Sequence, residues 1–476
     1  MANSFALLSS IIGIPFLGML FVLASKETQT GKSNNCINVS IFTILTNLIM
    51  LWRVFMVIDE KSPKLQLYEK FNWVSAPDIN LVFAVDNTSL LIILALHLAI
   101  LMGIIFSRSV LERPKALMTF TLMFLGLSTG LFVAADIFSF FIFFEAILLP
   151  LFMLIGMYGG SKRRERHSRF FIYNLIGSFV LFSAILLIYK YYGNLVLTAS
   201  SKILWDKNYG WYIWGALLFG LISRIPIWPF HYWISSIVSN IKNPLVFIAS
   251  SVLPLSGIYG IVRFWSDNIP VEVSAHFIWL NVIGIVTMLF ISLIGFINKD
   301  SQYKIFSFVT IYYIMYLIGI FSQNETILNY IGYALFGFLI IFGAYSVISG
   351  YIQHQEELHE TNAVGFLCRA KRLSIIYSFL TFAAIGFPVS AMFTNNFLII
   401  SELLSEQIHL GMIMLFANIM VSITLLSELF RLKTDTKECI LTKSEDISLG
   451  HFIFMLFIVF MLLMSFIKPL WFVINE

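Results

Sequence analysis

Apolar stretches of roughly 20 residues recur along the whole chain and are separated by short polar gaps such as Ser25–Asn34 and Gly160–Ser168. Because lipid offers the backbone no hydrogen-bond partners, segments that cross a membrane must be helices or closed barrels. Barrel strands alternate apolar and polar residues, whereas these stretches are apolar throughout. The pattern therefore predicts an all-α, polytopic membrane protein.

The scarcity of charge supports the same class. Only 12% of the 476 residues are charged and 59% are hydrophobic, whereas a soluble globular chain is about one quarter charged. So few charges cannot cover a water-facing surface of this size, and we expect the lipid bilayer to cover it instead. The net charge of +4 is mild and does not indicate a nucleic-acid partner.

The apolar stretches predict about 14 transmembrane helices, which we place near residues 4–24, 35–58, 83–107, 116–136, 137–159, 170–193, 211–234, 243–264, 275–298, 303–321, 327–350, 373–404, 408–430 and 449–470. No gap between them is long enough for a soluble domain, so we expect a single transmembrane domain over residues 1–476. Met1–Ala24 has neither a cationic region before its apolar run nor a small-residue cleavage site. These features favour a retained first span over a signal peptide.

The loops differ in their content of Lys and Arg. One set of alternate loops holds most of these residues, among them Arg108, Lys162, Lys299 and Arg431. Loops rich in Lys and Arg stay on the cytoplasmic side of a membrane or its mitochondrial equivalent. We therefore expect both termini on the opposite, non-cytoplasmic side, which requires an even number of spans.

Two predicted spans contain helix-breaking residues. The seventh contains the run RIPIWP from Arg224 to Pro229, and the twelfth contains Gly386-Phe387-Pro388. Proline removes a helix hydrogen bond and clashes with the preceding turn. Interrupted spans in corresponding halves of a chain are typical of inverted repeats with an ion path near the middle of the membrane, although two simple proline kinks would give the same pattern.

Glu145 is the most conspicuous charge within a span, because it lies in the apolar run FFIFFEAILLP that ends at Pro150. A carboxylate in lipid must find a partner or take up a proton. Its expected partner is Arg224, whose guanidinium stays protonated and therefore cannot carry a proton itself. The pair is predicted to belong to a proton path, and a structural ion pair that joins two helices is the alternative.

Other charged residues lie near predicted span ends. Asp136 lies between the fourth and fifth spans and Asp86 opens the third, where each could be either a helix-start carboxylate or part of an ion path. For Arg53, Lys190 and Arg263 we expect side chains that extend to the membrane surface.

His231 adjoins the break in the seventh span and is a candidate proton carrier, whereas His97 is more typical of a packing residue. The HxxxxH spacing in Gln353–Glu360 is wrong for the HExxH metal motif, so a loop exposed to solvent is expected there. The sequence contains no phosphate-binding glycine loop, dinucleotide fingerprint or haem-ligating histidine pair, and its three cysteines are far apart. We therefore expect neither a metal nor a cofactor in this chain.

The segment DIFSFFIFFE, from Asp136 to Glu145, followed by Pro150, resembles the fifth-helix motif of the antiporter-like subunits of respiratory complex I. These are subunit M of bacterial NADH-quinone oxidoreductase, mitochondrial subunit 4, and related subunits of multisubunit cation/proton antiporters. Further segments are similar to other helices of this family: Val85–Ser89, Arg169–Tyr173, Pro226–Trp233, Tyr259–Phe264 and Gly386–Pro388. The similarity covers most of the chain, and the order of the segments is more specific than any one of them.

The resemblance implies a 14-helix fold with two inverted five-helix repeats, at about 116–264 and 275–430, with helices 7 and 12 broken. It implies assembly with other membrane subunits in a bacterial or mitochondrial inner membrane. It further implies that protons are translocated while NADH, FMN, iron–sulfur clusters and quinone bind to partner subunits.

Several positions depart from the family's proton path. Glu145 is retained, but the family's lysines in helices 7 and 8 correspond to Arg224 and Leu255. Its histidines in helices 10 and 11 correspond to Tyr312 and Tyr333. The charge in helix 12 corresponds to Asn396, and the His and Pro after helix 7 correspond to Val238 and Lys242.

These departures predict an altered activity, because a proton relay needs groups that gain and lose protons near neutral pH. Leucine and asparagine do not titrate there, and an unperturbed tyrosine ionises near pH ~10. We therefore expect a divergent complex I subunit whose pumping is weakened or lost, or rerouted through Tyr312, Tyr333 and Glu402. A subunit of a multisubunit Na+/H+ antiporter and a non-transporting structural paralogue are the alternatives.

Overall fold

A computed structural model describes residues 6–25, 34–59, 62, 65–74, 79–107, 113–158, 163–192, 210–231, 243–265, 277–359, 365–388, 390–434 and 446–475. The described parts form two compact units. Unit 1 lies within Met1–His97, Leu111–Ile237 and Ala249–Ile278, and unit 2 lies within Leu98–Val110, Val238–Ile248 and Trp279–Glu476. Helices α3 (Asn87–Ser107) and α10 (Pro244–Gly260) contribute to both units.

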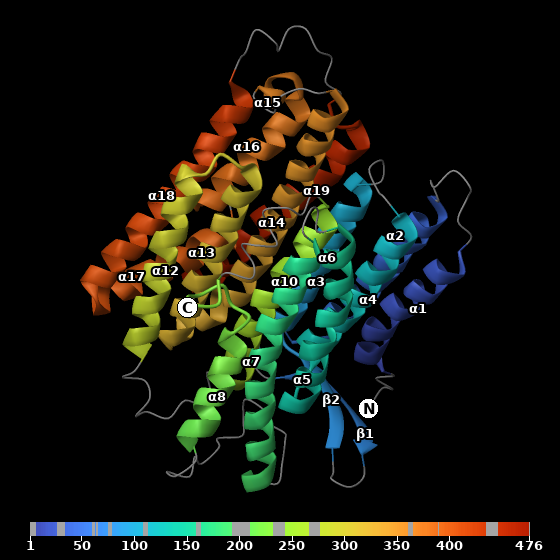
Figure 1. The fold of residues 1–476 in the computed structure, drawn as a ribbon, viewed down its shortest axis with the longest axis vertical. Coiled ribbons are helices and arrows are strands. Elements are labelled where there is room, and N and C mark those ends of the chain that lie inside the picture. Colours follow the sequence, from blue (N-terminus) through green and yellow to red (C-terminus); the bar gives the residue numbers. More distant parts are fainter. Residues whose placement is uncertain are drawn as a thin grey trace. The chain divides into compact units, whose positions relative to one another are not determined.

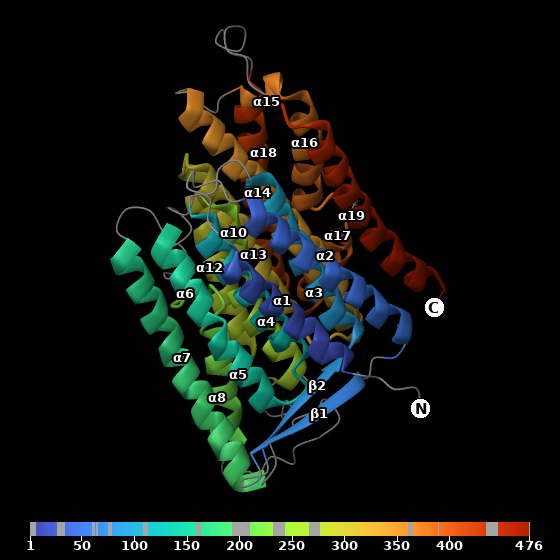
Figure 2. The same cartoon turned by 90° about the vertical axis from the view of Figure 1, so that its right-hand side faces the viewer.

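The remaining elements of unit 1 are α1 (Leu7–Ala24), α2 (Asn34–Val57), strands β1 (Gln66–Val74) and β2 (Ile79–Val85), α4 (Pro114–Val133), α5 (Ile137–Ala146), α6 (Leu148–Tyr158), α7 (Arg163–Tyr192), α8 (Gly210–Ile222) and the π-helical turn η1 (Ile261–Trp265) (Figure 1). Those of unit 2 are α12 (Phe277–Ile297), α13 (Ser301–Phe321), α14 (Glu325–His359), α15 (Phe366–Arg369), α16 (Lys371–Ile385), α17 (Ala391–Glu406), α18 (Ile408–Lys433) and α19 (Leu449–Asn475). Within unit 1, α7 and α8 run side by side (Figure 2).

Among the described residues, twelve helices are long and apolar enough to cross a membrane, and each coincides with one of the predicted spans. The helical membrane fold is thus confirmed. The other two predicted spans are the two that contain helix-breaking residues, and neither is a continuous helix in the described residues. The inverted-repeat relationship stays a prediction.

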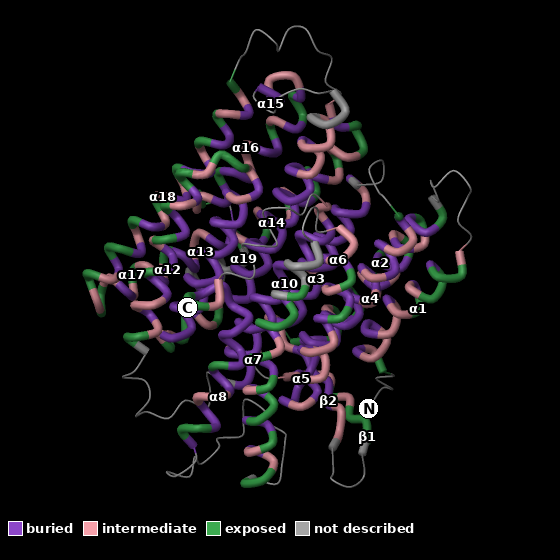
Figure 3. The backbone as a smooth tube through the Cα atoms, in the orientation of Figure 1, coloured by how far each residue is buried: buried purple, intermediate pink, exposed green. Residues whose placement is uncertain are grey.

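Burial differs strongly between helices, as Figure 3 shows for the described residues. The membrane-length segments of α13 and α14 are completely buried. In α2, by contrast, large apolar side chains are exposed, including Phe42, Ile49 and Trp52. Such a contiguous apolar surface is suited to lipid, since in water it would be unusually large.

A β-hairpin that the sequence did not predict accompanies the helices. β1 and β2 pair antiparallel in unit 1, with Glu69 opposite Phe83 and Phe71 opposite Leu81. The predicted third span began at residue 83, but its first residues belong to β2. Their apolar run could form either a strand or a helix, and pattern alone does not distinguish the two.

The hairpin is held by helix termini of the same unit. The Glu69 carboxylate accepts hydrogen bonds from Leu8 N at 2.8 Å and Ser9 N at 3.0 Å, and from the Ser9 hydroxyl. The amide groups of Leu8 and Ser9 lie in the first turn of α1, where backbone amides have no partner within the helix. Val82 N donates to Asp136 Oδ2 at 3.2 Å, and Ala135 N donates to Val82 O at 2.8 Å. The hairpin therefore fixes both the start of α1 and the junction of α4 with α5.

The predicted break in the twelfth span is confirmed. α16 ends at Ile385, and its C-cap residue Gly386 has a φ of 94°, a conformation that glycine adopts without a steric penalty. Pro388 follows, and α17 begins at Ala391. The apolar stretch is thus two helices with a non-helical connection between them.

Candidate functional site

Glu145 and Arg224 form an ion pair in unit 1, as the sequence predicts. Glu145 lies in the last turn of α5, and Arg224 lies two residues after the end of α8. Arg224 Nη2 is 2.9 Å from Glu145 Oε1, and the side chains are 0% and 27% exposed, respectively. The acid therefore faces a partly open environment while the permanent cation is sealed inside the protein.

Arg224 has further contacts that hold its guanidinium in place. Nη1 donates to the carbonyl oxygen of Phe144 at 2.5 Å, and the guanidinium carbon lies 3.2 Å from the centre of the Phe144 ring. On the other side of the pair, the Ser178 hydroxyl of α7 donates to Glu145 Oε1. Three elements, α5, α7 and the end of α8, thus converge on one carboxylate.

The local sequence explains why α8 ends beside this carboxylate. Ser223, Arg224 and Ile225 still donate backbone hydrogen bonds to Phe219, Leu221 and Ile222, but the prolines at 226 and 229 cannot continue the helix. Close packing of α7 on α8 holds the end of α8 near the Glu145 carboxylate. A Cβ atom on Gly177 would lie 1.8 Å from Ser223 Oγ, so only glycine fits there. Residues 232–234 of the predicted seventh span, and Val238 and Lys242 in the loop after it, lie outside the described residues.

Asp136 is confirmed as a helix-start carboxylate. Its Oδ1 accepts hydrogen bonds from Phe138 N at 3.0 Å and Ser139 N at 2.9 Å, which caps α5, and the Ser139 hydroxyl donates to Oδ2. Asp136 lies at the opposite end of α5 from Glu145, about 13 Å away at 1.5 Å of helix rise per residue. The two carboxylates of the resemblance motif therefore occupy separate sites.

Arg263 corrects the expectation that its side chain extends to the membrane surface. It is 8% exposed, and its Nη1 lies 2.7 Å from Asp86 Oδ2. Asp86 Oδ1 in turn accepts a hydrogen bond from Ser89 N at 2.8 Å in the first turn of α3. The preceding turn is fixed too, because the Tyr259 hydroxyl donates to Phe132 O at 2.7 Å. Asp86 and Arg263 thus form a second buried ion pair in unit 1.

The histidines have different environments. His97 is fully buried, with Nε2 at 2.8 Å from Asn47 Nδ2 and Nδ1 at 2.8 Å from Ile93 O, which confirms a packing role. His231 is half-buried and is the last described residue after the α8 break. The run that begins at Gln353 is helical to His359 as the end of α14, so the expectation of a loop there was wrong.

The departing positions that the structure describes are all buried. Leu255 is 0% exposed on α10, Tyr333 is 7% exposed on α14, and Asn396 is 4% exposed on α17. Tyr312 on α13 donates its hydroxyl hydrogen to Ala384 O at 2.7 Å, so it is bound to the last turn of α16 beside the break. Glu402 is half-buried farther along α17.

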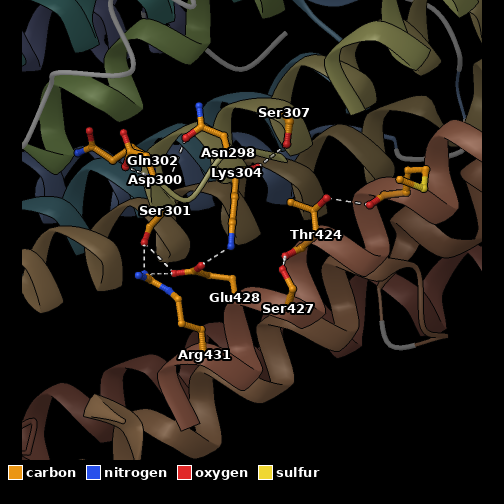
Figure 4. Close-up of polar contacts among 11 residues, drawn as sticks. Asn298, Asp300, Ser301, Gln302, Lys304, Ser307, Thr424, Ser427, Glu428 and Arg431 are labelled. Atoms are coloured by element: carbon orange, nitrogen blue, oxygen red, sulfur yellow. Dashed lines mark hydrogen bonds and ion pairs between the residues drawn. The ribbon is translucent and has the colours of Figure 1, made fainter. Parts of the chain in front are cut away.

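Sequence reasoning missed a charged cluster in unit 2. Figure 4 shows Glu428 of α18 between Lys304 of α13 and Arg431 of α18. Lys304 Nζ is 2.8 Å from Oε2, and Arg431 Nη2 is 2.6 Å from Oε1. Arg431 is among the residues expected in loops, and Lys304 lies at the very start of the predicted span 303–321. Glu428 itself lies within the predicted span 408–430, where a carboxylate is costly unless paired, and that signal could have identified the site.

Comparisons with known proteins agree with this architecture. Residues 134–424 match the family described as "NADH:quinone oxidoreductase/Mrp antiporter, TM". The chain is 26% identical to NADH-quinone oxidoreductase subunit M of Rhodobacter capsulatus over 416 residues, which is 82% of this chain and 79% of that protein. It is 25% identical to NADH-ubiquinone oxidoreductase chain 4 of Marchantia polymorpha over 438 residues, which is 87% and 85% of the two chains.

Solved structures show the same fold. A chain of respiratory complex I from Thermus thermophilus with bound NADH superposes with a TM-score of 0.83 at 18% identity, and 96% of each chain is covered. A chain of the membrane-bound sulfane sulfur reductase, an archaeal respiratory membrane complex, gives 0.81 at 16% identity, with 97% of this chain and 76% of that chain covered. Since the matched segment from 134 to 424 is more than half of the sequence and contains both helix breaks, the chain belongs to the transmembrane NADH:quinone oxidoreductase/Mrp antiporter family.

Proposed function

We propose that this chain is a membrane subunit of an NADH-quinone oxidoreductase, in the position that subunit M or chain 4 holds in its relatives. The observation that supports this most strongly is the Glu145–Arg224 pair at the break after α8, on a chain that aligns with those subunits over more than four fifths of its length. Other membrane subunits would be its partners. NADH, FMN, iron–sulfur clusters and quinone would bind to other subunits of the complex.

The ion pair supports a role in proton movement that depends on Glu145 alone. A guanidinium stays charged, so Arg224 can bias the carboxylate but cannot pass on a proton. Glu145 is 27% exposed, and its Oε1 accepts a hydrogen bond from the Ser178 hydroxyl. We propose that the exposed part of the carboxylate is where protons reach it. Because Leu255 and Asn396 do not titrate, we propose that pumping along the family's route through these positions is weakened or lost.

The orientation proposed from the loop charges agrees with the contacts within unit 2. Lys304 at the start of α13 touches Glu428 near the end of α18, and we take these two helix ends to lie on one side of the membrane. Both ends belong to the loops rich in Lys and Arg. We propose that this side faces the bacterial cytoplasm or mitochondrial matrix, and that both termini lie on the other side.

The first test is to purify the tagged chain in mild detergent and identify co-migrating proteins by mass spectrometry. We expect subunits that oxidise NADH and carry iron–sulfur clusters. Recovery of only small antiporter-type membrane subunits would reject this function in favour of a multisubunit Na+/H+ antiporter. Recovery of no partner at all would indicate a lone paralogue.

The second test is Glu145→Gln, with NADH-driven acidification of inside-out vesicles as the measurement. We expect at least about a tenfold slower acidification per NADH oxidised, because a positioned proton-transfer group is lost. Glu406→Gln, at an exposed position at the end of α17, is the matched control and should behave as the wild type. An unchanged rate for Glu145→Gln would show that the pair is only structural.

A further inference from the structure

The cluster around Glu428 combines a buried acid with two different cations. Glu428 is 3% exposed, and each of its oxygens has its own cation: Lys304 on Oε2 and Arg431 on Oε1. The Ser301 hydroxyl adds a hydrogen bond to Oε1 at 2.7 Å and accepts one from Arg431 Nη2 at 2.7 Å. The carboxylate is therefore fully compensated, and the cluster carries one positive charge in excess.

The two cations differ in what they can do. Arg431 stays protonated, whereas a lysine amine in a buried site can release its proton. If Lys304 becomes neutral, Glu428 still has Arg431 at 2.6 Å and Ser301 at 2.7 Å. The Glu428 carboxylate therefore remains paired after Lys304 loses its proton. A buried carboxylate without a partner would cost several kcal/mol.

A cavity lies beside this cluster, lined by exposed as well as buried residues. Its volume is about 190 Å³, and its lining includes Lys299, Asp300, Tyr377, Glu428 and Arg431. Lys299 and Asp300 are exposed at its outer part, whereas Glu428 and Tyr377 are buried. The space is large enough for several water molecules and is lined by polar groups that can bind them. Lys304 is not part of the lining and lies behind Glu428.

We propose that Lys304 is a proton-loading site of unit 2 and that Glu428 is the group through which it exchanges protons with water in this cavity. A hydronium ion in the cavity gives its proton to a Glu428 oxygen. The new O–H bond then breaks as an N–H bond forms at the neutral Lys304 Nζ. The net change is one hydronium ion and one amine converted to one water and one ammonium, with Arg431 charged throughout.

The surroundings supply few competing groups. Besides Ser301, the titratable or polar side chains that line the cavity beside the cluster are Tyr377 from α16, Ser349 and Gln353 from α14, and Lys299 and Asp300 from the turn before α13. One turn along α16 from Tyr377, the Thr381 hydroxyl donates to the backbone carbonyl oxygen of Tyr377 at 2.7 Å and accepts a hydrogen bond from the Tyr345 hydroxyl at 2.8 Å. These groups lead along α16 toward its break, and they give a loaded proton a polar direction of travel within unit 2.

The proposal rests on the proposed function, because the test measures proton movement by the whole complex. A static clamp between α13 and α18 would use the same contacts, but the two roles rank substitutions differently. A clamp needs a lasting positive charge, so Lys304→Arg should preserve it better than Lys304→His. A proton-loading site needs a group that gains and loses a proton, so Lys304→His should work better than Lys304→Arg.

The experiment uses inside-out vesicles that contain the assembled complex, with NADH-driven acidification measured against pH and normalised to NADH oxidation. We expect Lys304→Arg to slow acidification by at least about tenfold, and Lys304→His to restore part of the rate with an optimum at lower pH. Lys371, exposed at the start of α16, supplies the control, and its Arg and His variants should match the wild type. Native gel migration of the complex establishes assembly for each variant.

The outcomes separate the two proposals. If deletion of this chain leaves NADH-driven acidification unchanged, the proposed function falls and the loading site falls with it. If deletion abolishes acidification but Lys304→Arg equals the wild type or exceeds Lys304→His, the loading site alone is overturned. Should Lys304→Arg fail to assemble, Lys304→Met replaces it, because Glu428 keeps its bond to Arg431. An assembled Lys304→Met complex that still acidifies at the wild-type rate would overturn the loading site as well.

Discussion

The Glu145–Arg224 pair of unit 1 and the Glu428 cluster of unit 2 differ in which partner is more deeply buried. In unit 1 the side chain of Arg224 is 0% exposed and the acid Glu145 is 27% exposed. In unit 2 the acid Glu428 is 3% exposed, while its cations Lys304 and Arg431 are 8% and 33% exposed. The comparison teaches that the arginine, which stays charged, is the more deeply buried partner in unit 1 and the more exposed partner in unit 2.

The largest expected effect distinguishes the two acids by stability. Glu428→Gln leaves Lys304 and Arg431 facing a neutral amide, and we expect the free energy of unfolding to fall by about 3–5 kcal/mol. Glu145→Gln should cost less, since Arg224 keeps the Phe144 carbonyl and ring. Thermal unfolding of the purified complex in detergent measures both, with Glu406→Gln as control. Equal losses at positions 145 and 428 would contradict the difference between the pairs.

An intermediate effect tests the geometry of the pair in unit 1. Arg224 uses two nitrogens for two partners, Glu145 Oε1 and Phe144 O. An ammonium on a flexible stem does not reproduce that fork. Arg224→Lys should therefore cost about 1.5–3 kcal/mol, the range for one hydrogen bond to a charged group, while it introduces a cation that can titrate. A thermal midpoint equal to that of the wild type would show that the two-nitrogen contact of Arg224 contributes nothing to stability.

The smallest expected effect compares two serines with equivalent roles. The Ser178 hydroxyl donates to Glu145 and the Ser301 hydroxyl donates to Glu428. Ser301→Ala should cost about 1–2 kcal/mol and Ser178→Ala about half of that, because the partly exposed Glu145 can replace the lost bond with water. The same thermal assay resolves the order. A larger loss of stability for Ser178→Ala than for Ser301→Ala would contradict the view that Glu428 depends more on its serine than the partly exposed Glu145 does.

Several features were predictable because they depend on the local sequence. Apolar runs of membrane length gave the spans, and Gly386-Phe387-Pro388 gave the break between α16 and α17. Glu145 was recognisable because a lone carboxylate in an apolar run requires a partner. Other features were not predictable. The hairpin at Gln66–Val85 looked like a polar loop followed by a helix, since a short apolar run fits either a strand or a helix.

The ion pairs show the same limit. Arg263 looked like a residue at a span end, and only the fold brings Asp86, 177 positions away, to 2.7 Å from it. Likewise, Lys304 and Glu428 are 124 positions apart, and neither carries a local signal for the other.

By itself, the sequence determined that the chain is a bundle of membrane helices with two broken spans and a carboxylate in the fifth. It could do so because hydrophobicity, proline chemistry and the cost of a charge in lipid act on local segments. The tertiary structure alone decided which charges meet, how deeply each is buried and where water can reach. These depend on packing between segments distant in the chain, so they appear only when the helices are placed against one another.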